Sequence, residues 1–66
     1  MKLYSIINTD GETEGLLASS ADSDTMFSTW ERLCKADTMA SIDDLLEDLK
    51  SQGLQAERVY CDEIYP

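Results

Sequence analysis

Acidic side chains are the groups of this sequence whose type and spacing could do chemistry. Residues 41–53 read SIDDLLEDLKSQG and place four carboxylates among leucines, and two more acids follow near the end of the chain. Carboxylates can transfer protons, ligate hard metal ions or attract a basic surface. We predict the third role and expect the partner-binding residues to be Asp43, Asp44, Glu47, Asp48, Asp62 and Glu63.

The residue types that most catalytic sites need are missing from the sequence. It contains no histidine, which excludes an imidazole base and every Ser-His-Asp or Cys-His arrangement. No GxGxxG, Walker or HExxH motif is present. Paired carboxylates act on a glycosidic bond only inside a cleft, and a chain of 66 residues can scarcely form one. We therefore expect a non-enzymatic protein without a cofactor.

Metal binding is also poorly supported by the sequence. A zinc site would have to combine Cys34 and Cys61 with carboxylates, which does not match the common structural ligand sets. Asp10, Glu12 and Glu14 could hold a cation loosely, but the ligand spacing of a calcium-binding EF-hand loop is not met. We predict no metal site. Both cysteines are interpreted as small buried apolar residues, with a disulfide as the alternative if the chain is exported.

Length and charge limit the fold and its partners. The 66 residues suffice for one domain, residues 1–66, and 14 Asp and Glu oppose 5 Lys and Arg to give a net charge of −9. Nucleic acid and anionic membranes would repel such a chain. No apolar run approaches the length of a membrane span, and no signal-peptide pattern follows Met1. We expect a cytoplasmic protein whose partner is a protein with a basic surface.

Two strands are predicted in the first third of the chain. Residues 2–8, KLYSIIN, have the β-branched and aromatic composition of a strand and end in a cluster of turn residues. Asp10-Gly11 predicts a hairpin, for which residues 15–20 are the returning strand. Because both faces of the first strand are partly apolar, we expect it to be a central strand. This strand and a C-terminal strand within residues 55–66 carry the most β-branched and aromatic residues, so we expect the two to be neighbours.

Two helices are predicted between the strands. Residues 20–37 form the first, capped by Asp22 or Ser23, with Glu31 and Lys35 placed for an ion pair. Its apolar stripe consists of Met26, Phe27, Trp30, Leu33 and Cys34. Residues 41–53 form the second, for which Ser41 and Asp44 resemble a capping box and Gly53 suits a left-handed C-terminal position. Its apolar stripe consists of Ile42, Leu45, Leu46 and Leu49.

The order β-β-α-α-β predicts a small α+β fold. A two- or three-stranded sheet, made of the hairpin and the C-terminal strand, is packed on one face by both helices. The edges of so small a sheet are open, so pairing of one edge with its symmetry mate would give a homodimer.

Two classes of function agree with these elements. On a helix the four carboxylates between residues 43 and 48 span about 140°, opposite the leucines, and should project into water as one anionic ridge. The first class is a protein-interaction module whose acidic surface binds a basic partner, in its sharpest form an inhibitor that mimics nucleic acid, of viral or mobile-element type. The second is an accessory or assembly subunit that recognises its partner through apolar and aromatic groups, with the charge serving solubility. Its anchors would be Tyr4, Tyr60 or Tyr65.

Overall fold

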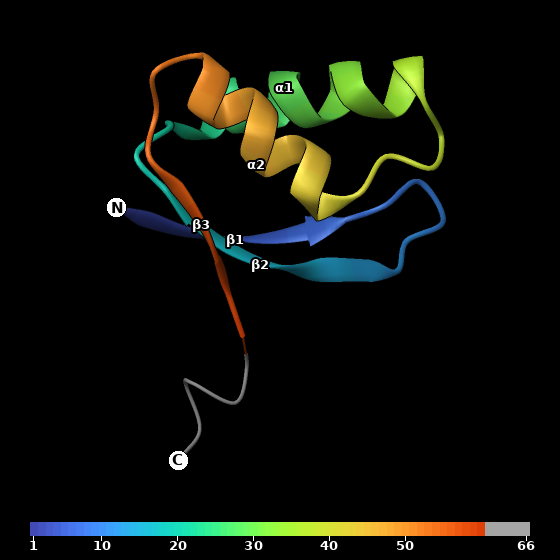
Figure 1. Cartoon of the computed structure of the whole chain (residues 1–66). Coiled ribbons are helices and arrows are strands. Elements are labelled where there is room, and N and C mark those ends of the chain that lie inside the picture. Colours follow the sequence, from blue (N-terminus) through green and yellow to red (C-terminus); the bar gives the residue numbers. More distant parts are fainter. Residues whose placement is uncertain (61–66) are drawn as a thin grey trace.

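The computed structural model describes residues 1–60 as an antiparallel sheet with both helices on one side (Figure 1). Residues 61–66, which include Cys61, lie outside the described part. The predicted α+β class and the order β-β-α-α-β are confirmed. The elements are β1 (Lys2–Ile7), β2 (Thr13–Ser19), α1 (Ser23–Ala36), α2 (Ile42–Ser51) and β3 (Ala56–Val59).

The strand order is β1-β2-β3, so β2 is the central strand. Ile6 of β1 pairs with Gly15 of β2, and Leu16 of β2 pairs with Val59 of β3. The prediction that the first strand is central and neighbours the last one is therefore wrong. Only one face of β1 is buried, because Ile6 is 4% exposed whereas Leu3 and Ile7 on the other face are 58% and 52% exposed.

The central strand contains residues that are poor strand formers, and the structure shows why they are there. Ser19 is fully buried. Its hydroxyl donates to the carbonyl of Gln55 at 2.7 Å and accepts from the amide of Ala21 at 3.1 Å. A buried hydroxyl needs such partners. Because they come from the turn before α1 and the segment before β3, Ser19 fixes the position at which these three segments meet.

Local signals set the helix ends as predicted. The carboxylate of Asp22 accepts from the amide of Thr25 at 2.8 Å and caps α1. Ser41 and Asp44 form the predicted capping box of α2. At the C-terminal end of α2, Gly53 has a φ of +82°. Its amide bonds the carbonyl of Lys50, and the amide of Leu54 bonds that of Leu49, which is the Schellman pattern.

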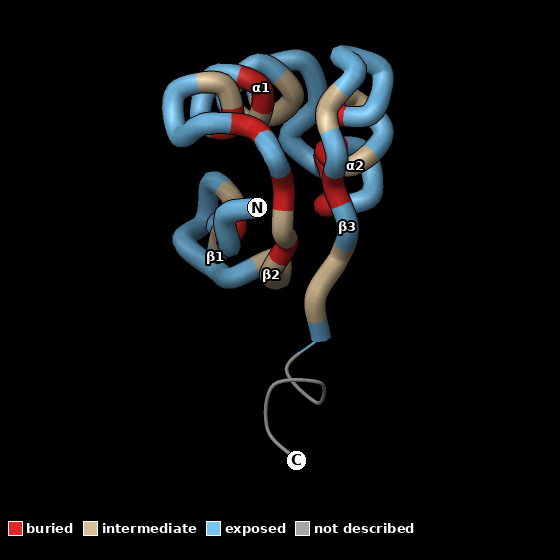
Figure 2. Tube along the Cα trace, turned by 90° about the vertical axis from the view of Figure 1, so that its left-hand side faces the viewer, coloured by how far each residue is buried: buried red, intermediate tan, exposed pale blue. Residues whose placement is uncertain are grey.

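The core lies between the sheet and the helices, where Figure 2 shows buried positions on β2 and on both helices. Its largest fully buried apolar side chains are Leu17, Leu45 and Leu49. The inward position of Phe27 is a wrong prediction, since this ring is 69% exposed and Thr29 is buried instead. Among residues 1–60, no helix is long and apolar enough to cross a membrane.

Thr29 takes the inward position because its hydroxyl accepts a hydrogen bond from the side-chain amide of Gln52 at 3.1 Å, across the contact between α1 and α2. The inward face of α1 is therefore rotated toward Thr29. On the helix, Phe27 lies about 160° away from Thr29 and so points into solvent.

Candidate functional site

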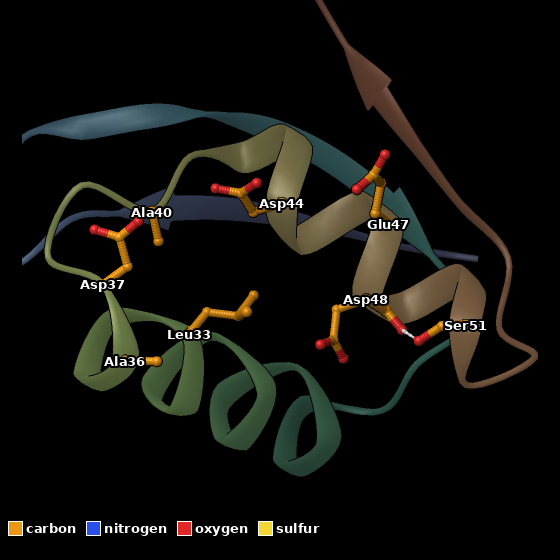
Figure 3. Close-up of a pocket in the computed structure, with 8 residues that line it drawn as sticks. All are labelled: Leu33, Ala36, Asp37, Ala40, Asp44, Glu47, Asp48 and Ser51. Carbon is orange, nitrogen blue, oxygen red and sulfur yellow. Dashed lines mark hydrogen bonds between the residues drawn. The ribbon is translucent and has the colours of Figure 1, made fainter.

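A groove of about 500 Å³ runs between α1 and α2. Figure 3 shows its lining, with Leu33 pointing from α1 toward α2 and Asp48 pointing back from α2 toward α1. Leu33, Ala36 and Ala40 supply apolar surface. The groove is therefore apolar at its base and acidic around it, with carboxylates from Asp37, Asp44, Glu47 and Asp48.

The helix termini hold two of these carboxylates in place. Asp37 is the C-cap residue of α1, its amide bonds the carbonyl of Leu33 at 2.9 Å, and its carboxylate accepts from the amide of Met39 at 2.9 Å. Asp44 is the third residue of α2, and its Oδ2 accepts from the amide of Ser41 at 3.0 Å. The connection between the helices is short, so these two aspartates face the same groove.

Asp48 is compensated by a basic residue. Its Oδ1 accepts from Arg32 at 2.7 Å and from Gln52 at 2.8 Å, and its side chain is only 20% exposed. The hydrogen bond from Arg32, followed by that from Gln52, holds the pKa of this carboxyl below its ordinary value. Asp48 thus belongs to a polar contact between the two helices, at one end of the groove.

The other predicted residues are divided between two sides of α2. Asp43 is exposed on the side that faces β3, where its carboxylate lies 3.9 Å from the guanidinium of Arg58. Glu47 is exposed and has no ion pair or side-chain hydrogen bond with the residues that the structure describes. The leucines point inward as predicted. The carboxylates, however, do not form one ridge, and Asp62 and Glu63 lie outside the described residues.

Sequence reasoning missed Asp37 and the apolar base of the groove. The only signal for Asp37 was its place directly after the first helix, before a short connection that brings it beside the start of the second. Leu33 was assigned to the core stripe, and Ala36 and Ala40 carried no signal. Within residues 1–60, no group of three or more Cys, Asp or Glu is arranged to hold a metal ion.

The remaining candidate side chains within residues 1–60 add no reactive group to the groove. The thiol of Cys34 is half-buried rather than buried, and burial, followed by the charge of Glu14, raises its pKa, which disfavours the nucleophilic thiolate. Tyr4 is half-buried and donates to the carbonyl of Ala21 at 2.6 Å, so its hydroxyl is occupied. Tyr60 is 53% exposed, and the guanidinium of Arg58 lies over its ring at 5.2 Å from the ring centroid. Tyr65 lies outside the described residues.

Comparison with protein-family models, with curated proteins and with solved structures gives no match to this chain. The groove and the surfaces around it are therefore the features of this chain that bear on its function.

Proposed function

We propose that this chain is a non-enzymatic protein-interaction module of the cytoplasm, and that its groove between α1 and α2 binds basic side chains of a protein partner. The observation that carries the proposal is the pairing of an apolar base with several carboxylates, of which only Asp48 has an arginine partner among residues 1–60.

Lysine and arginine fit such a groove better than other side chains. Their methylene stems can cover apolar surface while the charged end stays in a polar environment. Leu33, Ala36 and Ala40 offer that surface. Asp37 and Glu47 offer the acceptors, and the capping box of α2 uses only Oδ2 of Asp44, so Oδ1 is left to accept from a partner. Binding of a cationic side chain at Oδ1 therefore does not compete with the capping hydrogen bonds at the start of α2.

A nucleic-acid mimic is the most specific form of this proposal. Carboxylates on successive helical turns lie about 5–6 Å apart. A protein site that binds the phosphates of a nucleic-acid strand presents a row of basic groups, which such a row of carboxylates could meet. With a net charge of −9 on 66 residues, the chain is attracted to such a site at long range. It would then inhibit its partner by occupying the place of nucleic acid.

Titration of the isotope-labelled chain with a short arginine-rich peptide, followed by NMR, tests the groove. We expect amide shifts to concentrate at residues 33–37 and 40–48, and the affinity to fall steeply with added salt. Glu47→Gln should weaken binding severalfold, because Glu47 contributes a charge without holding the fold. Glu12→Gln at the exposed hairpin tip makes the same change of charge elsewhere and should leave binding nearly unchanged.

Two results would contradict the proposal: shifts spread evenly over all acidic residues, or equal weakening by both variants. Capture from a lysate of the native host, washed at two salt concentrations, then identifies the partner. Displacement of nucleic acid from the captured protein distinguishes the mimic from a module that binds elsewhere on it.

A further inference from the structure

The outer edge of β1 exposes unpaired backbone groups. The amide of Asn8 donates to the carbonyl of Glu12, on the side of β2. The carbonyl of Ile7 shares that peptide unit and points the opposite way, because the two groups of a trans peptide are antiparallel. Alternation along the strand then turns the backbone N–H and C=O of Leu3 and Ser5 outward as well.

One end of this edge is closed by a side chain. The indole of Trp30 donates to the outward carbonyl of Ile7 at 2.8 Å. A strand that added to β1 could therefore not pair at Ile7, but it could pair along residues 2–6. The groups available between these limits are the N–H and C=O of Leu3 and of Ser5.

Apolar side chains accompany the open edge. Met1, Leu3 and Ile7 are 65%, 58% and 52% exposed. Figure 2 shows α1 above β1. Phe27 of α1 lines a hollow together with Ile7 and Trp30. Exposed apolar side chains gathered on one side of a small protein indicate an interaction surface.

Charge distinguishes β1 from every other element of residues 1–60. It contains no carboxylate, whereas β2, β3 and both helices each contain at least one. The opposite edge, β3, has only four residues and carries Glu57 and Arg58, and short charged edges resist pairing. Two chains of net charge −9 repel one another over most of their surface, so β1 is where they approach at least cost.

We propose that β1 pairs with β1 of a second copy of this chain to form a symmetric antiparallel dimer. The two-fold axis passes by Tyr4, so that Leu3 of each copy bonds Ser5 of the other through both backbone groups. This register uses all the outward groups between Leu3 and Ser5. It places Met1 of each copy opposite Ile7 of the other, where the indole of Trp30 already occupies the carbonyl and the pairing ends. The two Leu3 side chains become diagonal neighbours across the axis, within about 7–8 Å.

The dimer joins two three-stranded sheets into one six-stranded sheet with all four helices on one side. The contact is a short edge with apolar flanks, at the small end of specific interfaces, so association is expected at micromolar concentrations. Added salt should strengthen it by screening the repulsion between the copies. Binding of a basic peptide in the groove between α1 and α2 should instead weaken with salt, so the two proposals can fail independently.

Sedimentation equilibrium of the full chain over a range of concentrations tests the dimer. We expect the mass to rise from the 7.4 kDa of the monomer toward twice that value. Ser5→Pro should abolish association, because it removes an outward N–H that the intramolecular ladder does not use. Leu3→Lys should weaken it at least tenfold by placing two ammonium groups beside the axis. Met39→Lys is the matched control, since Met39 is 83% exposed in the connection between the helices.

Circular dichroism establishes that each variant is folded. If Ser5→Pro fails to fold, the dimer is tested by comparing the association of Leu3→Lys with that of Met39→Lys. A wild-type chain that stays at 7.4 kDa up to millimolar concentration would overturn the proposal. So would association that Leu3→Lys and Met39→Lys affect equally, because the contact would then lie elsewhere.

Discussion

Replacement of Gly53 by alanine isolates the contribution of one backbone conformation to the stability of this fold. Gly53 ends α2 with a φ of +82°, and a Cβ added there would meet no atom within 4 Å. The variant thus loses no contact and creates no clash. Its only effect in the folded state is to place an alanine in the left-handed region.

The expected cost follows from that conformation. A left-handed backbone costs an L-residue about 1–2 kcal/mol. Alanine recovers part of this because it restricts the unfolded chain more than glycine does, so a net loss of about 1 kcal/mol is expected. For a domain of this size, that corresponds to a decrease of roughly 4–8 °C in Tm. Asparagine, which tolerates the left-handed region better, should lose less.

Urea denaturation with an unchanged slope, together with thermal unfolding, measures the loss. Gly11→Ala is the matched comparison, since Gly11 has a φ of +87° and equally open surroundings. Both variants should be destabilised by similar amounts. An unchanged or higher stability of Gly53→Ala would refute the assignment of this residue to a Schellman ending, and so the way in which the chain turns from α2 toward β3.

Two further predictions concern charge. Because the pKa of Asp48 is lowered in the folded chain, its ionised form stabilises the fold at pH values above the ordinary aspartate pKa of 3.8, and this stability is lost as the pH falls below that pKa. Acid unfolding monitored by circular dichroism should therefore show a smaller pH dependence in Asp48→Asn. A profile identical to that of the wild type would contradict the contact with Arg32. Added sodium chloride should raise the Tm at neutral pH, because repulsion within a net charge of −9 outweighs the exposed ion pairs, and a Tm that falls with salt would show the reverse.

The helix ends were predictable because their signals are local. Asp22 is bonded to the amide of Thr25, three residues away, and Ser41 and Asp44 are likewise three residues apart. The arrangement of the strands was not predictable in this way. It depends on contacts between distant segments, such as the bond from Ser19 to Gln55, and no composition of β1 alone distinguishes a central strand from an exposed edge that carries apolar residues.

The candidate site was predictable only in part for the same reason. Helical periodicity correctly placed the leucines of α2 inward, but its carboxylates are divided between the side that faces β3 and the groove beside α1. Which carboxylates remain uncompensated depends on Arg32 and Arg58, and these arrive from α1 and β3. Phe27 could not be placed either, because Thr29 competes for the inward position through a partner that lies 23 residues away in the sequence.

The junction at Ser19 also determines how this small domain can open. The amide of Ala21 donates to the Ser19 hydroxyl, which is itself bonded to the segment before β3, so β2, the start of α1 and β3 cannot separate without breaking these bonds. Solvent deuterium should reach the Ala21 amide only when the whole chain unfolds. Its exchange rate therefore reports the global free energy of unfolding, while the amides at the outer edge of β1 exchange from the native monomer.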